Sequence, residues 1–77
     1  MMIINEKVIV GIVNDTPKYV VWRGKNYVIL KIGLHHTFHE GRTLYHIFSV
    51  ATSGIFMRLR FDSENLIWSL EEMLENQ

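Results

Sequence analysis

The run Trp22-Arg23-Gly24-Lys25-Asn26-Tyr27 constrains the fold most, because it places a tight turn between apolar segments at residues 19–21 and 28–30. Glycine adopts positive φ without steric cost, so Gly24 followed by Lys25 suits a two-residue hairpin turn. That turn predicts strands over residues 18–23 and 26–34. It also predicts a register of four cross-strand pairs: Trp22 with Tyr27, Val21 with Val28, Val20 with Ile29, and Tyr19 with Leu30.

Large apolar side chains fall on both faces of this predicted hairpin. Open antiparallel sheets usually cover one face and leave the other to water. Residues 7–13 are almost wholly apolar as well, which predicts a strand with both faces covered. The pattern favours a strongly curled sheet, a small barrel, or a sheet whose second face meets another subunit.

A second hairpin is predicted over residues 43–61, with its turn at Ser53-Gly54. One face pairs Val50 with Met57, Phe48 with Leu59, and His46 with Phe61, which is typical of a core. The opposite face gathers a mixed set of side chains: Tyr45, Ile47, Ser49, Ala51, Phe56, Arg58 and Arg60. Residues 35–42 are expected to form a loop from their composition, and residues 14–17, which hold the single Pro, a turn.

The last segment, residues 62–77, fits two patterns. As a helix capped by Ser63, it aligns one apolar stripe: Leu66, Ile67, Leu70, Met73 and Leu74. As a strand, it alternates Leu66, Trp68 and Leu70, and it buries Trp68. A strand through about residue 70 with a short helical end satisfies both patterns, so the choice between strand and helix for residues 66–76 stays open.

The length and the lack of Cys limit what can stabilise the chain. A domain of 77 residues buries only roughly 60% of its unfolded surface, and without Cys it has no disulfide or thiolate metal site. A dense apolar core or self-association remains. We therefore expect one mainly β domain over residues 1–77, a curled antiparallel sheet or barrel-like fold of five to six strands that forms a homodimer.

Charge is unevenly distributed although its total is zero. Residues 1–61 carry +5 and residues 62–77 carry −5. A basic sheet neutralised by its own acidic segment explains this better than an acidic tail that screens a nucleic-acid surface, because a neutral total argues against strong phosphate binding. No targeting signal or bilayer-length apolar run is visible, so a cytoplasmic protein without membrane contact is expected.

Four His residues raise the question of a metal site. His35, His36, His39 and Glu40 lie within six residues, but their spacing is not the His-Glu-x-x-His pattern of catalytic zinc helices. His46 falls on the predicted core face, where a His is more often a packed core residue than a ligand. We expect no metal and no cofactor.

Residues for catalysis are sparse. There is no Cys, no Gly-x-Ser-x-Gly elbow and no phosphate-binding Gly motif. The adjacent carboxylates Glu71 and Glu72 cannot face each other on a strand or a helix, so they make a poor acid–base pair. We therefore expect a protein that is not an enzyme.

The remaining candidate surface is the face that carries Tyr45, Ile47, Phe56, Arg58 and Arg60. Aromatic residues beside Arg are enriched in protein interfaces, and they also stack on bases and hold phosphates. A third possibility is that the acidic last segment packs here and pairs Glu71 or Asp62 with the two Arg residues. We expect a binding module whose partner is another protein or a second copy, with a nucleic-acid-associated accessory domain as the alternative. A metal-dependent enzyme that uses the His-rich loop is the least favoured interpretation.

Three motifs resemble a group of small bacterial domains. They are Pro17 followed by Trp22-Arg23-Gly24-Lys25-x-Tyr27, then Arg58-Leu59-Arg60-Phe61-Asp62, then Trp68-Ser69-Leu70-Glu71. The group carries a Trp-Arg-Gly-Arg-x-Tyr hairpin and a closing Trp-x-Leu-Glu strand; here Lys25 replaces the Arg, and the His-rich segment is particular to this chain. The group is uncharacterised, and some members are associated with Y-family DNA polymerase-like proteins. The resemblance spans most of residues 17–72 and implies a compact β domain, Trp68 on a strand, and a DNA-repair context.

Overall fold

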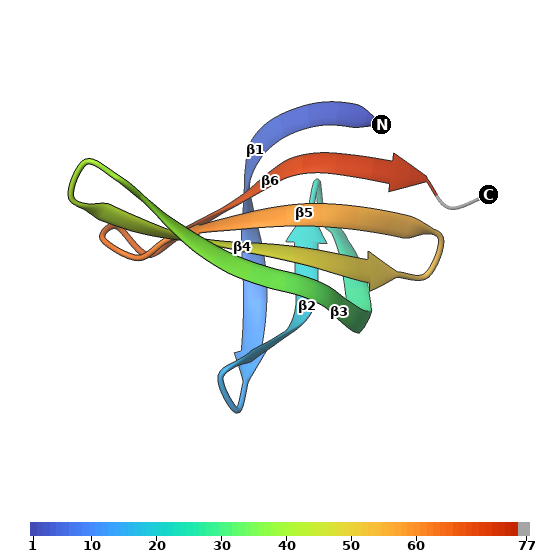
Figure 1. The fold of residues 1–77 in the computed structure, drawn as a ribbon. Helices are drawn as coiled ribbons and strands as arrows, with labels where there is room; N and C mark the ends of the chain where they lie inside the picture. Colours follow the sequence, from blue (N-terminus) through green and yellow to red (C-terminus); the bar gives the residue numbers. More distant parts are fainter. Residues whose placement is uncertain (76–77) are drawn as a thin grey trace.

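The computed structural model describes residues 1–75 and is built from strands alone. Six antiparallel strands follow one another in chain order around a closed ring, in which β1 pairs with β6 (Figure 1). The expected mainly β, barrel-like fold is therefore confirmed. The strands are β1 (Met2–Val13), β2 (Thr16–Trp22), β3 (Lys25–Glu40), β4 (Thr43–Thr52), β5 (Ile55–Asp62) and β6 (Ile67–Glu75).

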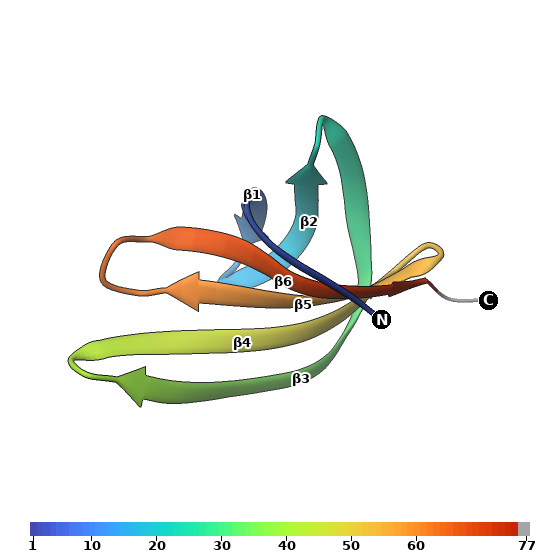
Figure 2. The same cartoon turned by 90° about the horizontal axis from the view of Figure 1, so that it is seen from above.

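Two long strands each belong to two sheets. Residues 2–8 of β1 pair with β6, and residues 9–13 pair with β2. Residues 25–28 of β3 pair with β2, and residues 29–40 pair with β4. Register irregularities bend both strands, as bulges do. The result is a three-stranded sheet that crosses a five-stranded one, which Figures 1 and 2 show as a group of upright strands beside a group of flat ones.

The first predicted hairpin exists, but its turn lies one residue earlier than expected. Arg23 and Gly24 occupy the turn with φ of 52° and 74°, and Trp22 pairs with Lys25. Positive φ at both positions is the geometry whose twist matches a hairpin. The observed pairs, such as Tyr19 with Val28, are therefore shifted by two residues from the predicted register. A shift of two leaves every side chain on its predicted face.

The second hairpin is confirmed pair by pair. Val50 pairs with Met57, Phe48 with Leu59, and His46 with Phe61, as the Ser53-Gly54 turn predicts. Gly54 adopts φ of 85°, which explains why glycine stands there. The turn before Pro17 is also present, and Asn14 and Asp15 form it with positive φ.

The prediction of a loop over residues 35–42 is wrong. β3 continues to Glu40, and a two-residue turn at Gly41-Arg42 leads directly into β4. These polar residues form a strand because each of them finds a partner on β4, from His35 with Phe48 to Glu40 with Thr43. Composition signalled their exposure correctly but did not signal this pairing.

The last segment is a strand as far as Glu75, and the helical alternative is not realised in the described residues; residues 76–77 lie outside them. β6 contains one extra residue opposite β5, since Arg58 pairs with Glu72 and Leu59 with Leu70. This bulge lets Leu70 and Met73 both point into the core although they are three residues apart. It therefore reproduces in a strand the spacing that suggested a helix.

The core lies inside the ring, where the two sheets face each other. It is formed by Val8, Val20, Trp22, Val50, Met57, Leu59, Leu70 and Met73. The expectation that both faces of residues 7–13 are covered is wrong within one copy of the chain. Ile9 is 65% exposed on the outer face of the three-stranded sheet, where Val28 is exposed too. The ring covers one face of β1 and leaves the other to solvent.

Candidate functional site

The five residues predicted to bind a partner share the outer face of the five-stranded sheet. The β4–β5 register places Ile47 opposite Arg60 and positions Tyr45, Phe56 and Arg58 on the same side. Ile47 lies outside the core cluster, yet it is only 1% exposed. Phe56 is 43% exposed, so its ring offers apolar area to solvent. The face combines a packed centre with an accessible aromatic side chain.

Glu71 neutralises much of the positive charge on this face. Its Oε1 lies 3.1 Å from Arg58 Nε, and its Oε2 lies 3.5 Å from Arg60 Nη1. The Arg60 guanidinium also lies over the Tyr45 ring, 5.3 Å from its centroid. The β6 bulge makes these ion pairs possible because Glu71 is its extra residue. The third possibility, that the acidic segment packs against the two Arg residues, is therefore confirmed for Glu71.

Asp62, the other acid considered for this role, caps the turn between β5 and β6 instead. Its Oδ1 accepts hydrogen bonds from the backbone N–H groups of Glu64 and Asn65 at 2.9 and 3.1 Å. Its Oδ2 accepts one from the Asn65 side-chain amide at 3.0 Å. The bonds from Asn65, side chain first, lower the pKa of the Asp62 carboxyl below its ordinary value. Asp62 therefore orders the turn.

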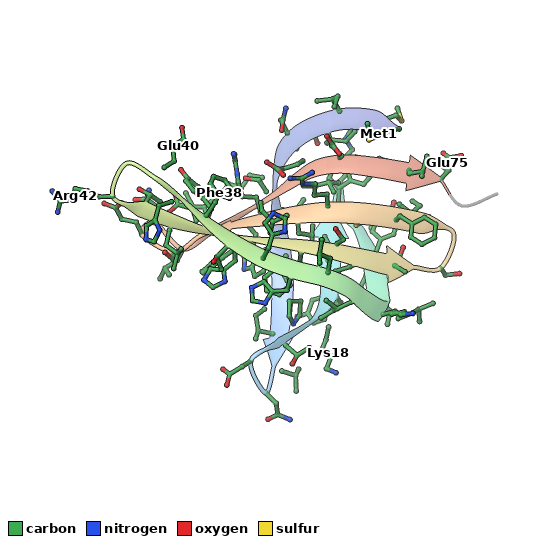
Figure 3. All side chains as sticks on the ribbon, viewed as in Figure 1. Met1, Lys18, Phe38, Glu40, Arg42 and Glu75 are labelled. Carbon is green, nitrogen blue, oxygen red and sulfur yellow. The ribbon has the colours of Figure 1, made fainter. Side chains whose placement is uncertain are left out.

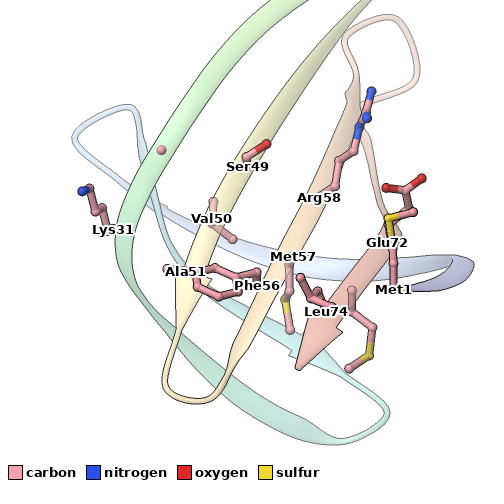
Figure 4. Close-up of a pocket in the computed structure, with 12 residues that line it drawn as sticks. Met1, Lys31, Ser49, Val50, Ala51, Phe56, Met57, Arg58, Glu72 and Leu74 are labelled. Atoms are coloured by element: carbon pink, nitrogen blue, oxygen red, sulfur yellow. The ribbon is translucent and has the colours of Figure 1, made fainter. Parts of the chain in front are cut away.

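A groove of about 440 Å³ lies on this outer face (Figure 4). Strands β3, β4, β5 and β6 line it, together with the residue that precedes β1. The lining residues are Met1, Lys31, Gly33, Ser49, Val50, Ala51, Phe56, Met57, Arg58, Glu72, Met73 and Leu74. Apolar side chains form most of its wall. Figure 4 shows Lys31 at one end of the groove and Arg58 and Glu72 at the other. Its volume falls in the range of sites that accept a small ligand or a few side chains.

The contributions of β1 and β6 to this groove were missed by sequence reasoning. Met1 and Leu74 line it because β1 and β6 pair across the ring, with Met2 opposite Met73. That pairing joins the two ends of the chain and has no local sequence signal. Leu74 gave no hint of its exposure, because the helical pattern placed it on the apolar stripe with Leu70 and Met73.

The four His residues do not form one cluster. Strand alternation places His35 on the face toward His46, while His36 points to the opposite face. His35 Nε2 and His46 Nδ1 share a hydrogen bond of 2.9 Å, and the His35 ring stacks on Phe48 at 4.1 Å. Among residues 1–75, no three His, Asp or Glu side chains converge on a point that could hold a metal ion. The rings of His35 on β3 and His46 on β4 instead pack against each other.

A second polar cluster lies at the first hairpin. Trp22 Nε1–H donates a hydrogen bond of 2.9 Å to Glu6 Oε1, and Arg23 Nε donates one of 3.1 Å to the same oxygen. The Arg23 bond is the larger cause, and the Trp22 bond the next, of a Glu6 pKa below its ordinary value. This cluster ties β1 to the β2–β3 turn and lies outside the groove.

Comparison with known proteins adds no relationship. The sequence matches no family model, and no curated protein or solved structure is significantly similar to the chain. Within residues 1–75, no helix is long and apolar enough to cross a membrane.

Proposed function

We propose that this protein is a non-enzymatic binding module that acts through a protein interface on the outer face of the five-stranded sheet and works as a homodimer. The observation that supports the interface most strongly is the groove, whose exposed apolar wall includes Phe56 and Leu74. A protein partner would insert apolar side chains there. Lys31, at the end of the groove opposite Arg58 and Glu72, would hold a polar or acidic group of that partner.

The charge balance of this face favours a protein over a nucleic acid. Glu71 contacts both Arg58 and Arg60, so phosphate groups would have to compete with a carboxylate already in place. Nucleic-acid binding relies on net positive charge that releases counterions. Protein interfaces tolerate such paired charges at their rims and use aromatic and Arg side chains as anchors.

The perturbed acids support a non-enzymatic role. The carboxyls of Glu6 and Asp62 have lowered pKa values, and each shift has a structural cause. Arg23 bonds to Glu6, and the turn residue Asn65 bonds to Asp62. Neither residue lines the groove. Catalytic acids and bases usually have their pKa shifted inside the cleft where they act.

Selection of a displayed peptide library on the immobilised protein tests the interface. Peptides that bind should be apolar, and Phe56→Asp should weaken their binding at least about tenfold, because a charge would enter the apolar groove. Leu66→Asp is the matched control, since Leu66 is 72% exposed and lies outside the groove. Equal binding to both variants, or no enriched peptide, would contradict the proposal.

A further inference from the structure

β3 has a free edge along most of its length. From residue 29 onward it pairs with β4 alone, because its pairing with β2 ends at Val28. Within the described part of the chain, β3 contacts no strand other than these two. Residues 33–42 are all exposed. Figure 2 shows β3 as the outermost strand of the larger sheet, with nothing beside it opposite β4.

The backbone groups on this edge can be assigned from the turn that follows it. Residues flanking a two-residue hairpin turn exchange backbone hydrogen bonds, and antiparallel pairs then alternate between bonded and non-bonded. Glu40 and Thr43 flank the Gly41-Arg42 turn. Counting back along β3, the N–H and C=O groups of His35, Thr37 and His39 point away from β4. They form a row of donors and acceptors ready for another strand.

The edge lacks the usual protection against strand pairing. Natural sheets cover exposed edges or place Lys, Pro or inward charges on them. Residues 34–39 contain no Lys, Arg, Asp, Glu or Pro. Two apolar side chains, Leu34 and Phe38, lie on the outer face here, 57% and 38% exposed, and Phe38 stacks on Tyr45 at 5.2 Å. Figure 3 labels Phe38 and Glu40 near the projecting end of β3.

We infer that the β3 edges of two copies of this chain pair antiparallel about a two-fold axis at His36. This register places Leu34 opposite Phe38 of the second copy, twice by symmetry. Because Gly33 is the extra residue of a β3 bulge, Lys31 then falls opposite Glu40 of the second copy, and opposite charges meet at both ends. Apolar and charged pairs thus match in one register.

The backbone contributes to the same register. His35 and Thr37 of one copy face Thr37 and His35 of the other, and both residues direct their free N–H and C=O groups outward. The two pairs supply four hydrogen bonds, close to the lower end of the number in typical protein interfaces. The inference rests on the homodimer in the proposed function and specifies its contact, which is separate from the groove.

Thr37→Pro tests the backbone contact. Proline removes the outward N–H of Thr37 but leaves the β4 ladder intact, and edge strands tolerate it for that reason. Thr37→Val is the matched control, because it changes the same side chain and keeps the N–H. In sedimentation equilibrium, Thr37→Pro should raise the dimer dissociation constant at least about tenfold, while Thr37→Val stays near wild type. Circular dichroism checks that both variants fold.

His36→Cys tests the register independently of stability. The chain has no Cys, so a single introduced thiol can only form a disulfide between copies. In the proposed dimer the two residues at position 36 form a non-hydrogen-bonded pair with Cα atoms about 4.5 Å apart, within reach of a disulfide. Mild oxidation should therefore cross-link His36→Cys at high yield. Lys18→Cys, an exposed position on β2, should cross-link at background level.

The outcomes separate the inference from the proposed function. A dimer that persists in Thr37→Pro, or a His36→Cys variant that cross-links no faster than Lys18→Cys, would overturn the β3 contact and leave self-association standing. A wild-type monomer at every concentration would overturn the homodimer as well. Peptide binding in the groove is unaffected by either result and is measured separately.

Discussion

Trp22 at the end of β2 donates its indole N–H to Glu6 on β1, at 2.9 Å. Arg23 adds two bonds to the same carboxylate and brings its guanidinium within 4.9 Å of the Trp22 ring centroid. A buried aromatic residue, a turn residue and a β1 carboxylate are thus joined at the place where β1 passes from one sheet to the other. Because of this contact, the stability of the fold depends on whether the Glu6 carboxyl is ionised.

Glu6 should make stability depend on acid pH. Its pKa in the folded protein lies below the ordinary value of about 4.5, so its contribution is present above that pH and is lost as the pH falls through the depressed value. Glu6→Gln should therefore lose less stability than wild type between pH 6 and pH 3 in urea unfolding. Asp15→Asn is the control. It removes a carboxyl in the turn between β1 and β2 and should behave like wild type. Parallel losses in wild type and Glu6→Gln would contradict this prediction.

Gly24→Val should lower the free energy of unfolding by about 1–2 kcal/mol, the usual cost of a left-handed conformation for a residue with a Cβ. No atom lies within 4 Å of the Cβ that such a change would add, so the cost comes from the backbone at φ 74°. Gly24→Asn should cost less because Asn tolerates this conformation. Chemical denaturation of both variants provides the measurement, and equal losses would show that the turn differs from the one described.

Met73→Ala and Leu74→Ala distinguish a bulged strand from a helix. Met73 is 6% exposed in the core, whereas Leu74 is 49% exposed. Met73→Ala should cost about 2–5 kcal/mol, as other buried Met or Leu truncations do, and Leu74→Ala within about 0.5 kcal/mol. Thermal and urea unfolding would measure the two losses. Comparable losses would mean that both side chains are buried on one stripe.

Glu71→Gln should expose the positive charge of Arg58 and Arg60. Wild type should bind a fluorescent single-stranded oligonucleotide weakly even at low salt, and Glu71→Gln should bind it more tightly with a clear decrease as salt rises. The triple variant with Arg58→Ala and Arg60→Ala added should lose that gain. The stability cost of Glu71→Gln should be about 1 kcal/mol, because the Arg58 and Arg60 side chains are 45% and 35% exposed although Glu71 itself is only 20% exposed. Tight, salt-dependent binding by wild type would instead favour the nucleic-acid alternative.

Local patterns predicted the hairpins well. The β4–β5 register followed from alternation and one Gly turn, because both determinants lie within the hairpin itself. The β2–β3 turn was placed one residue late, since Arg23 adopts a positive φ that its residue type does not suggest. Each side chain still lies on its predicted face, because a register shift of two residues does not exchange the two faces of a strand.

Non-local pairing accounts for the features that were not predicted. The His-rich end of β3 is a strand because β4 offers partners to it, and the groove exists because β1 meets β6. The spacing of Leu70 and Met73 imitated a helix, since a single bulge residue converts strand periodicity into a step of three. Of the candidate site, the outward-facing residues of β4 and β5 were found from alternation, and the groove residues on β3, on β6 and just before β1 were not.

The pairing of Met2 with Met73 has a consequence for how the chain folds. The β2–β3 and β4–β5 hairpins can form from neighbouring residues, but the ring closes only when strands separated by nearly the whole chain meet. Such distant contacts slow folding, because the entropy of closing the loop is lost before the contacts are gained. During synthesis, Val8 on β1 therefore stays exposed until β6, which carries its partner Trp68, has left the ribosome.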